Sequence, residues 1–368
     1  MSPAAPFPTP SLAPPFAGGA ERGLPNPTLL LPGDYIADAT ARVRAATRRV
    51  RLATLTIADE ERTADLIEAL IAAARRGVDV KIAADVFTYL DTAATLLPAG
   101  FRGRRRRESA SLVARLTEAG ARFTWLGSER GLIWRGRTHT KLCVVDDVSY
   151  AFGGVNLDDR GATNVDYMMR VDDPGLANDL DKVYTWMAEM GPSEIGHPSL
   201  TLRHGGDAVL IDGGMPGDSV IYRRAVELVA DATHVLLVSQ YCPTGELGRL
   251  ISARPHGLWF NRPRNATTAN RILIAASMAA SGHRTRYRAQ RYLHAKSLIM
   301  TMRTGERVAI TGSHNFVSAG VTLGTRELAL ETRSEQVIDQ LLAFHREHVV
   351  DGDVRDRRGA RDRPGAGR

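Results

Sequence analysis

The spacing of apolar residues predicts alternating strands and helices in the first third of the chain. A short apolar strand is expected at residues 28–31, a helix at about 34–48 and a strand from Val50 onward. Residues 59–76 repeat apolar positions at helical spacing, and the run VDVKIAADV at 78–86 is typical of a buried strand. This alternation predicts an α/β fold with parallel strand pairing.

The second half of the chain repeats this order of elements. Residues 210–241 follow residues 30–57 in their succession of strand, P-G-D turn, helix and strand. The run RILIAAS at 271–277 is predicted to be the third buried strand, equivalent to residues 78–86. An internal duplication explains the repeat, and two such halves are expected to pack about a pseudo-twofold axis. The predicted parts are a disordered Pro-rich arm (1–27), a first domain (28–195), a second domain (205–350) and a disordered charged tail (351–368).

Two segments interrupt the repeat, residues 88–110 and 253–270, and we expect both to be loops over a site. The first contains the basic run FRGRRRRES, which is either a solvated loop or a contact for anionic lipid headgroups or nucleic acid. The second contains Leu-Trp-Phe, for which core packing is the default and insertion into a bilayer interface is the alternative. The residues singled out in these segments are Arg104, Arg105, Trp259 and Phe260.

The composition favours an anionic partner but does not distinguish between the classes of such partners. The formal net charge is +7, and nucleic acid, an acidic membrane surface and a phosphorylated substrate all fit, as does a merely soluble basic protein. No stretch of 18 apolar residues occurs, and the amino terminus lacks the features of a secretory signal. Cys143 and Cys242 lie in apolar runs, which favours buried free thiols over a single disulfide. We therefore expect a cytoplasmic protein, peripheral at the inner face of the plasma membrane.

Two of the ten histidines are followed two positions later by lysine, although the chain has only four lysines. These are His139 with Lys141 and His294 with Lys296. Each pair precedes an apolar run and then a G-x-x-N sequence, so each is predicted to lie on the first strand of a β-hairpin. Residues i and i+2 of a strand share a face, so His and Lys should project together. The asparagines that end the two G-x-x-N sequences are Asn156 and Asn315.

This set of side chains suits a phosphodiester. Lysine neutralises the non-bridging phosphate oxygens, and an asparagine amide donates a further hydrogen bond. One imidazole can attack phosphorus, and the other can protonate the leaving oxygen and then activate the incoming hydroxyl. A carboxylate should orient each imidazole, and Asp166 and Glu327 lie at comparable distances past the two asparagines. The chemistry predicts no cofactor and no metal.

The runs HTKLCVVDD, GGVN, LHAKSLIMT and GSHN resemble the H-x-K-x4-D and G-S-x-N signatures of the phospholipase D superfamily. The layout is most similar to bacterial cardiolipin-synthase-like members, over roughly residues 28–345. The resemblance implies two α/β/α sandwich halves with both histidines at their interface. It also implies a ping-pong reaction through a phosphohistidine at His139, with His294 as general acid and base.

The resemblance also assigns supporting positions and shows two departures. The last motif position is Asp146 in the first half but Thr301 in the second, and Gly154 stands where the family has the serine that Ser313 supplies. Many cardiolipin synthases have an amino-terminal membrane anchor, and we expect none here. We interpret the family's aspartate as structural, so Thr301 is expected to affect activity modestly.

Three functions follow from these observations. The first is a phosphatidyltransferase or phospholipase D acting on anionic phospholipid at a membrane surface. The second is a nuclease with the same residues, and the third is a catalytically weakened binder of anionic membranes. A second basic run leads into the second motif and is predicted to bind a second phosphate through Arg284, Arg286, Arg288 and Arg291. Phospholipid and an anionic membrane are the predicted partners, nucleic acid is the second choice, and no obligate protein partner is predicted.

Overall fold

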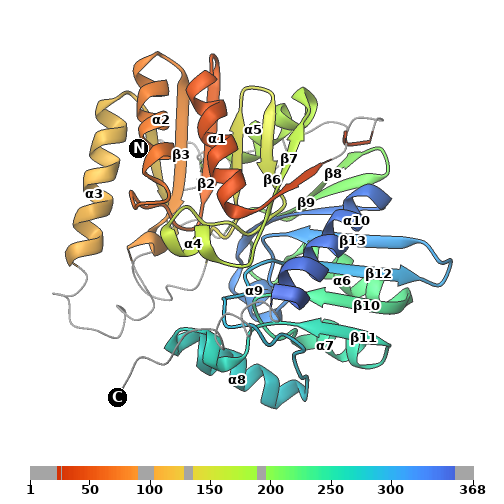
Figure 1. Cartoon of the computed structure of the whole chain (residues 1–368). Helices are drawn as coiled ribbons and strands as arrows, with labels where there is room; N and C mark the ends of the chain where they lie inside the picture. The colour runs from red at the N-terminus through yellow and green to blue at the C-terminus, as the bar shows by residue number, and fades with distance from the viewer. Residues whose placement is uncertain (1–22, 26, 90–102, 128–135, 189–195, 353–368) are drawn as a thin grey trace, which may run out of the picture.

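The computed structural model describes residues 23–25, 27–89, 103–127, 136–188 and 196–352. These form two mixed seven-stranded sheets, one from each half of the chain (Figure 1). The first sheet has the order β4-β3-β2-β5-β6-β7-β1, and the second has the order β11-β10-β12-β13-β14-β9-β8. The predicted α/β class is therefore confirmed. The predicted arm and tail lie almost entirely outside the described residues.

The strands of the first sheet are β1 (Thr28–Leu30), β2 (Arg49–Thr54), β3 (Asp79–Asp85), β4 (Arg122–Leu126), β5 (Leu142–Val145), β6 (Val148–Ala151) and β7 (Met168–Asp172). Those of the second sheet are β8 (Leu200–His204), β9 (Asp207–Gly213), β10 (Ala232–Val238), β11 (His256–Trp259), β12 (Ser297–Met302), β13 (Arg307–Gly312) and β14 (Arg326–Thr332). The helices are α1 (Pro32–Ala45), α2 (Ala64–Arg75), α3 (Gly103–Glu118), α4 (Asp159–Thr163), α5 (Pro174–Ala188), α6 (Val220–Asp231), α7 (Gly245–Ser252), α8 (Thr268–Ser281), α9 (Ser318–Leu323) and α10 (Glu335–Phe344). Three short turns of helix, η1 (Val86–Thr88), η3 (Pro263–Asn265) and η4 (His345–Val350), complete the described elements.

The strand order shows the duplication directly. The run β3-β2-β5-β6-β7-β1 in the first sheet has the same order as β11-β10-β12-β13-β14-β9 in the second. Parallel pairing is restricted to β2–β3, β3–β4 and β10–β11, and the other pairs are antiparallel. The expectation of a parallel sheet was therefore wrong for most of each sheet. Hairpins such as β5–β6 and β12–β13 need only a short turn, which forces antiparallel neighbours.

The third strand of the second half was assigned to the wrong segment. Residues 271–277 lie in helix α8, and the strand that pairs in parallel with β10 is β11, four residues within the predicted loop 253–270. A seven-residue apolar run fits either a strand or a helix, and here the helix runs on to a left-handed C-cap at Gly282. The predicted loop 88–110 also contains structure, because α3 begins at Gly103; residues 90–102 lie outside the described part.

The default of core packing for the Leu-Trp-Phe sequence is confirmed for two of its residues, and the alternative of membrane insertion is wrong for them. Leu258 and Phe260 are buried in the core of the second half, with 2% and 0% of their surface exposed. Trp259 is partly buried under the Arg286 guanidinium, 5.5 Å from the ring centre, and against the edge of His345. Pairing of β11 with β10 explains this, since it turns alternate side chains into the core.

Three clusters of buried apolar side chains stabilise the fold. One lies between the first sheet and helices α1 and α2, and another lies between the second sheet and helices α6 and α7. The third contains side chains of both sheets together with those of α5 and α10, so the two halves share one core. The two His-x-Lys motifs meet just before β5 and β12, which are interior strands of the two sheets. None of the described helices has the length and apolar character needed to cross a membrane.

Candidate active site

Each His-x-Lys motif lies in the extended segment just before a hairpin strand, one step earlier than predicted. His139 and Lys141 immediately precede β5, and His294 and Lys296 immediately precede β12. The residues between them, Thr140 and Ala295, have 0% of their surface exposed, as the alternation of strand faces requires. The imidazole centroids of His139 and His294 are 6.4 Å apart, so the two motifs face each other across one site.

The motif segment of each half pairs with the other half. The His139 backbone N–H donates to the Arg326 carbonyl at 2.9 Å, beside a bridge between Thr138 and Arg326. The His294 N–H donates to the Val165 carbonyl at 2.9 Å, beside a bridge between Leu293 and Val165. These two equivalent backbone bridges fix the position of each motif relative to the other.

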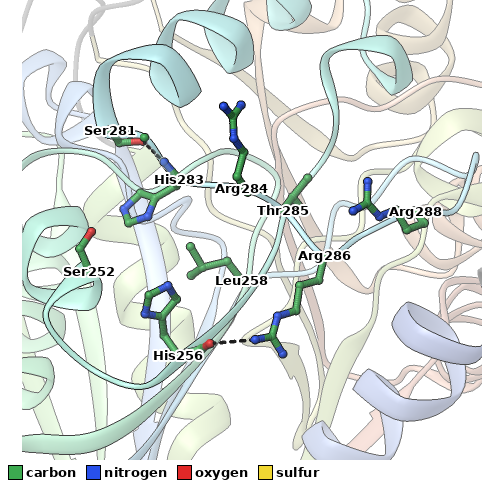
Figure 2. Close-up of a pocket in the computed structure, with 10 residues that line it drawn as sticks. Ser252, His256, Leu258, Ser281, His283, Arg284, Thr285, Arg286 and Arg288 are labelled. Carbon is green, nitrogen blue, oxygen red and sulfur yellow. Dashed lines mark hydrogen bonds between the residues drawn. The ribbon is translucent and has the colours of Figure 1, made fainter.

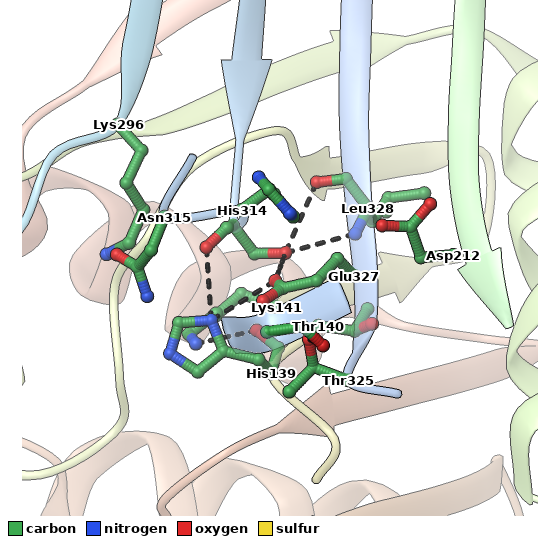
Figure 3. Close-up of polar contacts among 12 residues, drawn as sticks. His139, Thr140, Lys141, Asp212, Lys296, His314, Asn315, Thr325, Glu327 and Leu328 are labelled. Carbon is green, nitrogen blue, oxygen red and sulfur yellow. Dashed lines mark hydrogen bonds and ion pairs between the residues drawn. The ribbon is translucent and has the colours of Figure 1, made fainter. Parts of the chain in front are cut away.

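This backbone pairing between the halves determines which carboxylate contacts which imidazole. Glu327 follows Arg326, and its Oε2 lies 3.1 Å from Nδ1 of His139. Asp166 follows Val165, and its Oδ2 lies 2.7 Å from Nδ1 of His294. Each candidate carboxylate therefore serves the histidine of the opposite half, and Figure 3 shows the His139 ring turned toward Glu327.

These contacts also determine where the imidazole protons are. Nδ1 of His139 lies 3.0 Å from the Ser313 carbonyl oxygen as well as near Glu327, and both are acceptors only. Nδ1 therefore carries the proton in the neutral ring, which leaves the Nε2 lone pair free. Nδ1 of His294 lies 2.7 Å from Asp166 and 3.2 Å from Nζ of Lys296, and the nearer carboxylate, an acceptor only, favours a proton on Nδ1 here too. Burial lowers the pKa of His139, and burial with the charge of Lys296 lowers the pKa of His294 to about 3.

The two lysines are buried beside the histidines. Lys141 and Lys296 have 1% and 0% of their surface exposed, and each Nζ donates to the carbonyl of the histidine two residues before it. Burial and mutual repulsion lower the pKa of Lys141 to about 7, and burial lowers the pKa of Lys296 to about 8. Although burial alone would raise it, the pKa of Glu327 falls to about 2 because His139 and Lys141 stabilise its charge. The charged forms of both lysines are thus held out of water, at a cost in free energy. A bound anion would offset that cost, so the site favours an anionic ligand.

The two asparagines have buried amide oxygens without a partner. Oδ1 of Asn156 and Oδ1 of Asn315 accept no hydrogen bond from any described residue. Asn315 lies beside Lys296 in Figure 3. Unsatisfied buried polar atoms are rare and tend to occur where a ligand completes the bonding.

The glycine at the serine position has a local explanation. A Cβ added to Gly154 would lie 2.7 and 2.8 Å from the two carboxylate oxygens of Asp166. In the second half, Ser313 Oγ donates to Oε2 of Glu327. The shorter carboxylate in the first half therefore occupies the space that the serine side chain fills in the second.

The last motif positions have different roles. Asp146 accepts hydrogen bonds at 3.0 Å from the backbone N–H groups of Thr47, Arg48 and Arg49, so it anchors the start of β2 to the β5–β6 turn. Thr301 has no side-chain hydrogen bond within the part of the chain that the structure describes, and its carbonyl accepts from Thr233 at 3.0 Å. The structural interpretation of the aspartate is consistent with these contacts.

The predicted basic residues lie on α3 and in the segment between α8 and His294. Arg104 pairs with Glu108 along the exposed face of α3 at 2.8 Å, and Arg105 lies on the same helix. Arg291 donates to the Thr163 carbonyl at 2.9 Å, which links the halves. The remaining members of the second basic run, Arg284, Arg286 and Arg288, line a separate pocket.

Two residues at the site were not predicted. Asp85 is fully buried at the end of β3, where it pairs with Arg137 and accepts from the Thr138 N–H at 2.7 Å. It thereby holds the segment that leads into His139, and its position at the carboxyl end of a parallel strand could have indicated it. His314 accepts from the Phe316 N–H at 2.9 Å through Nδ1, and burial lowers its pKa to about 4. It is the variable residue of the second G-S-x-N sequence.

Two α/β halves with paired His-x-Lys segments at their interface define the phospholipase D type of fold. Residues 40–188 match the family model described as the phospholipase D-like domain of cardiolipin synthase. This match confirms the resemblance to the phospholipase D superfamily over those residues, and the similar structures below share the fold.

The chain is similar to phosphatidylserine synthase from Haemophilus influenzae Rd KW20, with a TM-score of 0.67 and 12% identity over 89% of this chain and 88% of that one. It is also similar to polyphosphate kinase from Porphyromonas gingivalis, with a TM-score of 0.55 and 12% identity over 86% of this chain. That alignment spans 46% of the kinase, about half its length. At these identities the likeness concerns the fold. No curated protein matches the sequence.

Proposed function

We propose that this chain transfers or hydrolyses the phosphatidyl group of an anionic phospholipid, through a phosphohistidine intermediate on His139. The observation that carries the proposal is the pair of facing histidines, each bonded through Nδ1 to a buried carboxylate of the other half. A histidine held in this way presents Nε2 as a nucleophile or as a proton carrier. The phospholipase D-like family match supports phosphodiester chemistry, and the phosphatidylserine synthase fold supports a lipid substrate.

In the first step the Nε2 lone pair of His139 attacks phosphorus, and the bond from phosphorus to the headgroup oxygen breaks. Once the anionic phosphate is bound, His294 is an imidazolium with a second proton on Nε2, and the leaving oxygen takes that proton, so the headgroup departs as an alcohol. Glu327 stabilises the positive charge that develops on the His139 ring. His139 is the better candidate nucleophile because its side chain is 12% exposed, against 6% for His294.

In the second step water or an alcohol attacks the phosphohistidine. The incoming hydroxyl gives its proton to Nε2 of His294, the new phosphorus–oxygen bond forms, and the phosphorus–nitrogen electron pair returns to His139. Lys141 and Lys296 offset the charge on the non-bridging oxygens in both steps. The negative charge of a bound phosphate also raises the pKa of His294, which prepares it to carry the proton.

The test is to incubate the purified protein with vesicles of labelled phosphatidylglycerol and to identify the products by mass spectrometry. Cardiolipin would show that an alcohol is the acceptor, and phosphatidic acid would show that water is. Both products should vanish in His139→Asn and persist in His234→Asn, a matched change at an exposed histidine on β10. Absence of any lipid product, with cleavage of single-stranded DNA by the same sample, would replace the proposal with a nuclease.

A further inference from the structure

Helix α8 exposes an apolar surface. Its sequence TANRILIAASMAAS contains one charged residue, Arg271, and the described side chain that it buries fully is Ile274. Ile272 and Leu273 are 66% and 46% exposed. A solvent-facing helix normally turns charged and polar residues outward. An outer face of isoleucine, leucine and alanine on this helix therefore calls for a partner that accepts apolar side chains.

The surroundings of α8 specify the charge of that partner. Residues 247–305 contain no aspartate or glutamate but ten arginines, a run that includes the whole helix. After α8 the chain is extended, with Thr285 and Tyr287 buried and with Arg284, Arg286 and Arg288 exposed on the alternate positions. No described carboxylate pairs with Arg284 or Arg288. A positive surface of this kind beside exposed apolar residues is complementary to an anionic lipid bilayer.

The arginines also line a pocket that the proposed chemistry does not use. It is a cavity of about 520 Å³ beneath the carboxyl end of α8, and its walls include His256, His283 and the three exposed arginines. Figure 2 shows the two imidazoles on one side and Arg286 across from His256, whose carbonyl it contacts at 3.4 Å. The size and the cationic lining suit the phosphate and glycerol of a lipid headgroup.

The amino-terminal end of α8 is connected to the candidate active site. Asn270 on α8 accepts a hydrogen bond from the Tyr241 hydroxyl at 3.0 Å, and its amide donates to the Tyr292 hydroxyl at 3.4 Å. The ring of Tyr292 lies 6.4 Å from that of His294, centre to centre. A membrane that covers α8 therefore lies within two side chains of the proposed proton carrier.

We propose that α8 and the following basic segment form a docking surface for an anionic lipid bilayer. Ile272 and Leu273 enter the boundary between headgroups and acyl chains, while Arg284, Arg286 and Arg288 contact the phosphates. Nucleic acid is the weaker candidate, because aliphatic side chains offer bases no aromatic platform for stacking. The inference rests on the proposed function for its choice of a lipid partner, but its test measures binding and needs no catalysis.

The test is flotation of the protein with phosphatidylcholine vesicles, with and without phosphatidylglycerol, in a His139→Asn background that prevents turnover. Binding should require phosphatidylglycerol and weaken with salt. The double variant I272D/L273D should lose about tenfold or more in vesicle affinity, and the double variant R284Q/R288Q a similar amount. The matched control is Val350→Asp, which changes an apolar residue that is 39% exposed outside α8 and should bind as the parent does.

Three results would overturn the docking surface. They are unchanged vesicle binding by I272D/L273D, a dimer of the parent protein that this variant dissociates, and arginine-dependent binding to single-stranded DNA with none to vesicles. Circular dichroism melting checks that each variant is folded. With His139 restored, I272D/L273D should still cleave a monomeric short-chain phosphatidylglycerol at the parent rate. If the protein with His139 intact bound vesicles but turned over no lipid, the proposed function would be wrong and the docking surface would stand.

Discussion

The half-site around His139 and the half-site around His294 are built from the same parts in different sizes. His139 is paired with the longer carboxylate, Glu327, which also accepts a hydrogen bond from Ser313. His294 is paired with the shorter Asp166, and a glycine stands where the serine would be. The comparison teaches that the carboxylate and the small residue vary together, because both occupy one volume behind the imidazole.

The two halves differ again at the end of the motif. Asp146 binds three backbone N–H groups at the start of β2, whereas Thr301 has no side-chain hydrogen bond among the described residues. Both hairpins nevertheless deliver their His-x-Lys segments to the same site. The pairing of imidazole and carboxylate therefore does not depend on how the hairpin is anchored. Substitutions in the pair should change catalysis, and substitutions in the anchor should change stability.

The largest expected effect distinguishes the two histidines. Replacing either by asparagine should lower phospholipid turnover by about 10⁴-fold or more, since both act in the reaction. A substrate with a 4-nitrophenolate leaving group needs no protonation, so His294→Asn should still release one equivalent and accumulate the phosphoenzyme. Intact-protein mass spectrometry measures that adduct. Its appearance in His139→Asn and absence in His294→Asn would reverse the assigned roles.

The next comparison concerns the crossed carboxylates. Glu327→Gln and Asp166→Asn keep the shape of each side chain but remove the charge that fixes the Nδ1 proton. Each should lower kcat by about 10²- to 10⁴-fold with little change in KM. Steady-state kinetics on a chromogenic phosphodiester measures this loss. Asp179→Asn, at a carboxylate that pairs with Lys182 on α5, is the matched control. A change in KM alone would mean that the carboxylates position substrate instead.

The lysines predict a pH dependence of anion binding. The pKa of Lys141 is about 7 and that of Lys296 about 8, so each is charged below its value and neutral above it. The affinity for vanadate should therefore be highest below pH 7 and fall as the pH rises through 8, by about tenfold for each lost charge. Calorimetry in buffers of different ionisation enthalpy should also detect proton uptake, because the bound anion raises both pKa values.

Two variants check the cause of this pH dependence. Lys296→Met should weaken vanadate binding and remove one of the two titrations. Lys182→Met, at a lysine whose side chain is 53% exposed, should leave the profile unchanged. A vanadate affinity that stays constant from about pH 6 to about pH 9, a range that spans both lysine pKa values, would rule out lysine charge as the source of the binding energy.

A smaller effect is expected from exchanging the packing behind the imidazoles. Ser313→Ala removes the hydrogen bond to Glu327 and should lower kcat by about tenfold, or ~1.4 kcal/mol. Gly154→Ala inserts a Cβ against Asp166 and the His294 carbonyl, and overpacking of this kind costs ~1–3 kcal/mol of stability. Chemical denaturation measures it, with Gly33→Ala as control because nothing lies within 4 Å there. Equal costs for the two glycines would contradict the shared-volume explanation.

The smallest effect separates anchoring from catalysis. Asp146→Asn retains the shape but weakens three hydrogen bonds to backbone N–H groups, so it should lower the free energy of unfolding by ~1–2 kcal/mol. The kcat of the folded protein should change less than about twofold. Thr301→Val, at the equivalent position, should change stability by less than ~0.5 kcal/mol. A large loss of kcat in Asp146→Asn at full stability would give this residue a part in the chemistry.

Several features were predictable from the sequence because they depend on local spacing. The i, i+2 placement of His139 and Lys141, and the hairpins that follow both motifs, need only the strand period of two. The duplication was visible because the second half repeats the order of elements of the first. The resemblance to the phospholipase D superfamily followed from the same local motifs.

Other features required the tertiary structure. A seven-residue apolar run has no distinctive period, so the sequence placed a strand at 271–277, where the fold has helix α8 and assigns the strand to β11. Phe260 read as a loop residue, but pairing of β11 with β10 buries it. The partner of each carboxylate was also undetermined by the sequence.

The sequence by itself determined which side chains are available: two histidines, two lysines, two asparagines and two carboxylates in repeated order. Only the tertiary structure decided that Glu327 meets His139 and that Asp166 meets His294. The reason is that strand period is a local property of the backbone, whereas pairing of residue 138 with 326 and of 165 with 293 depends on how sheets from the two halves of the chain share one core.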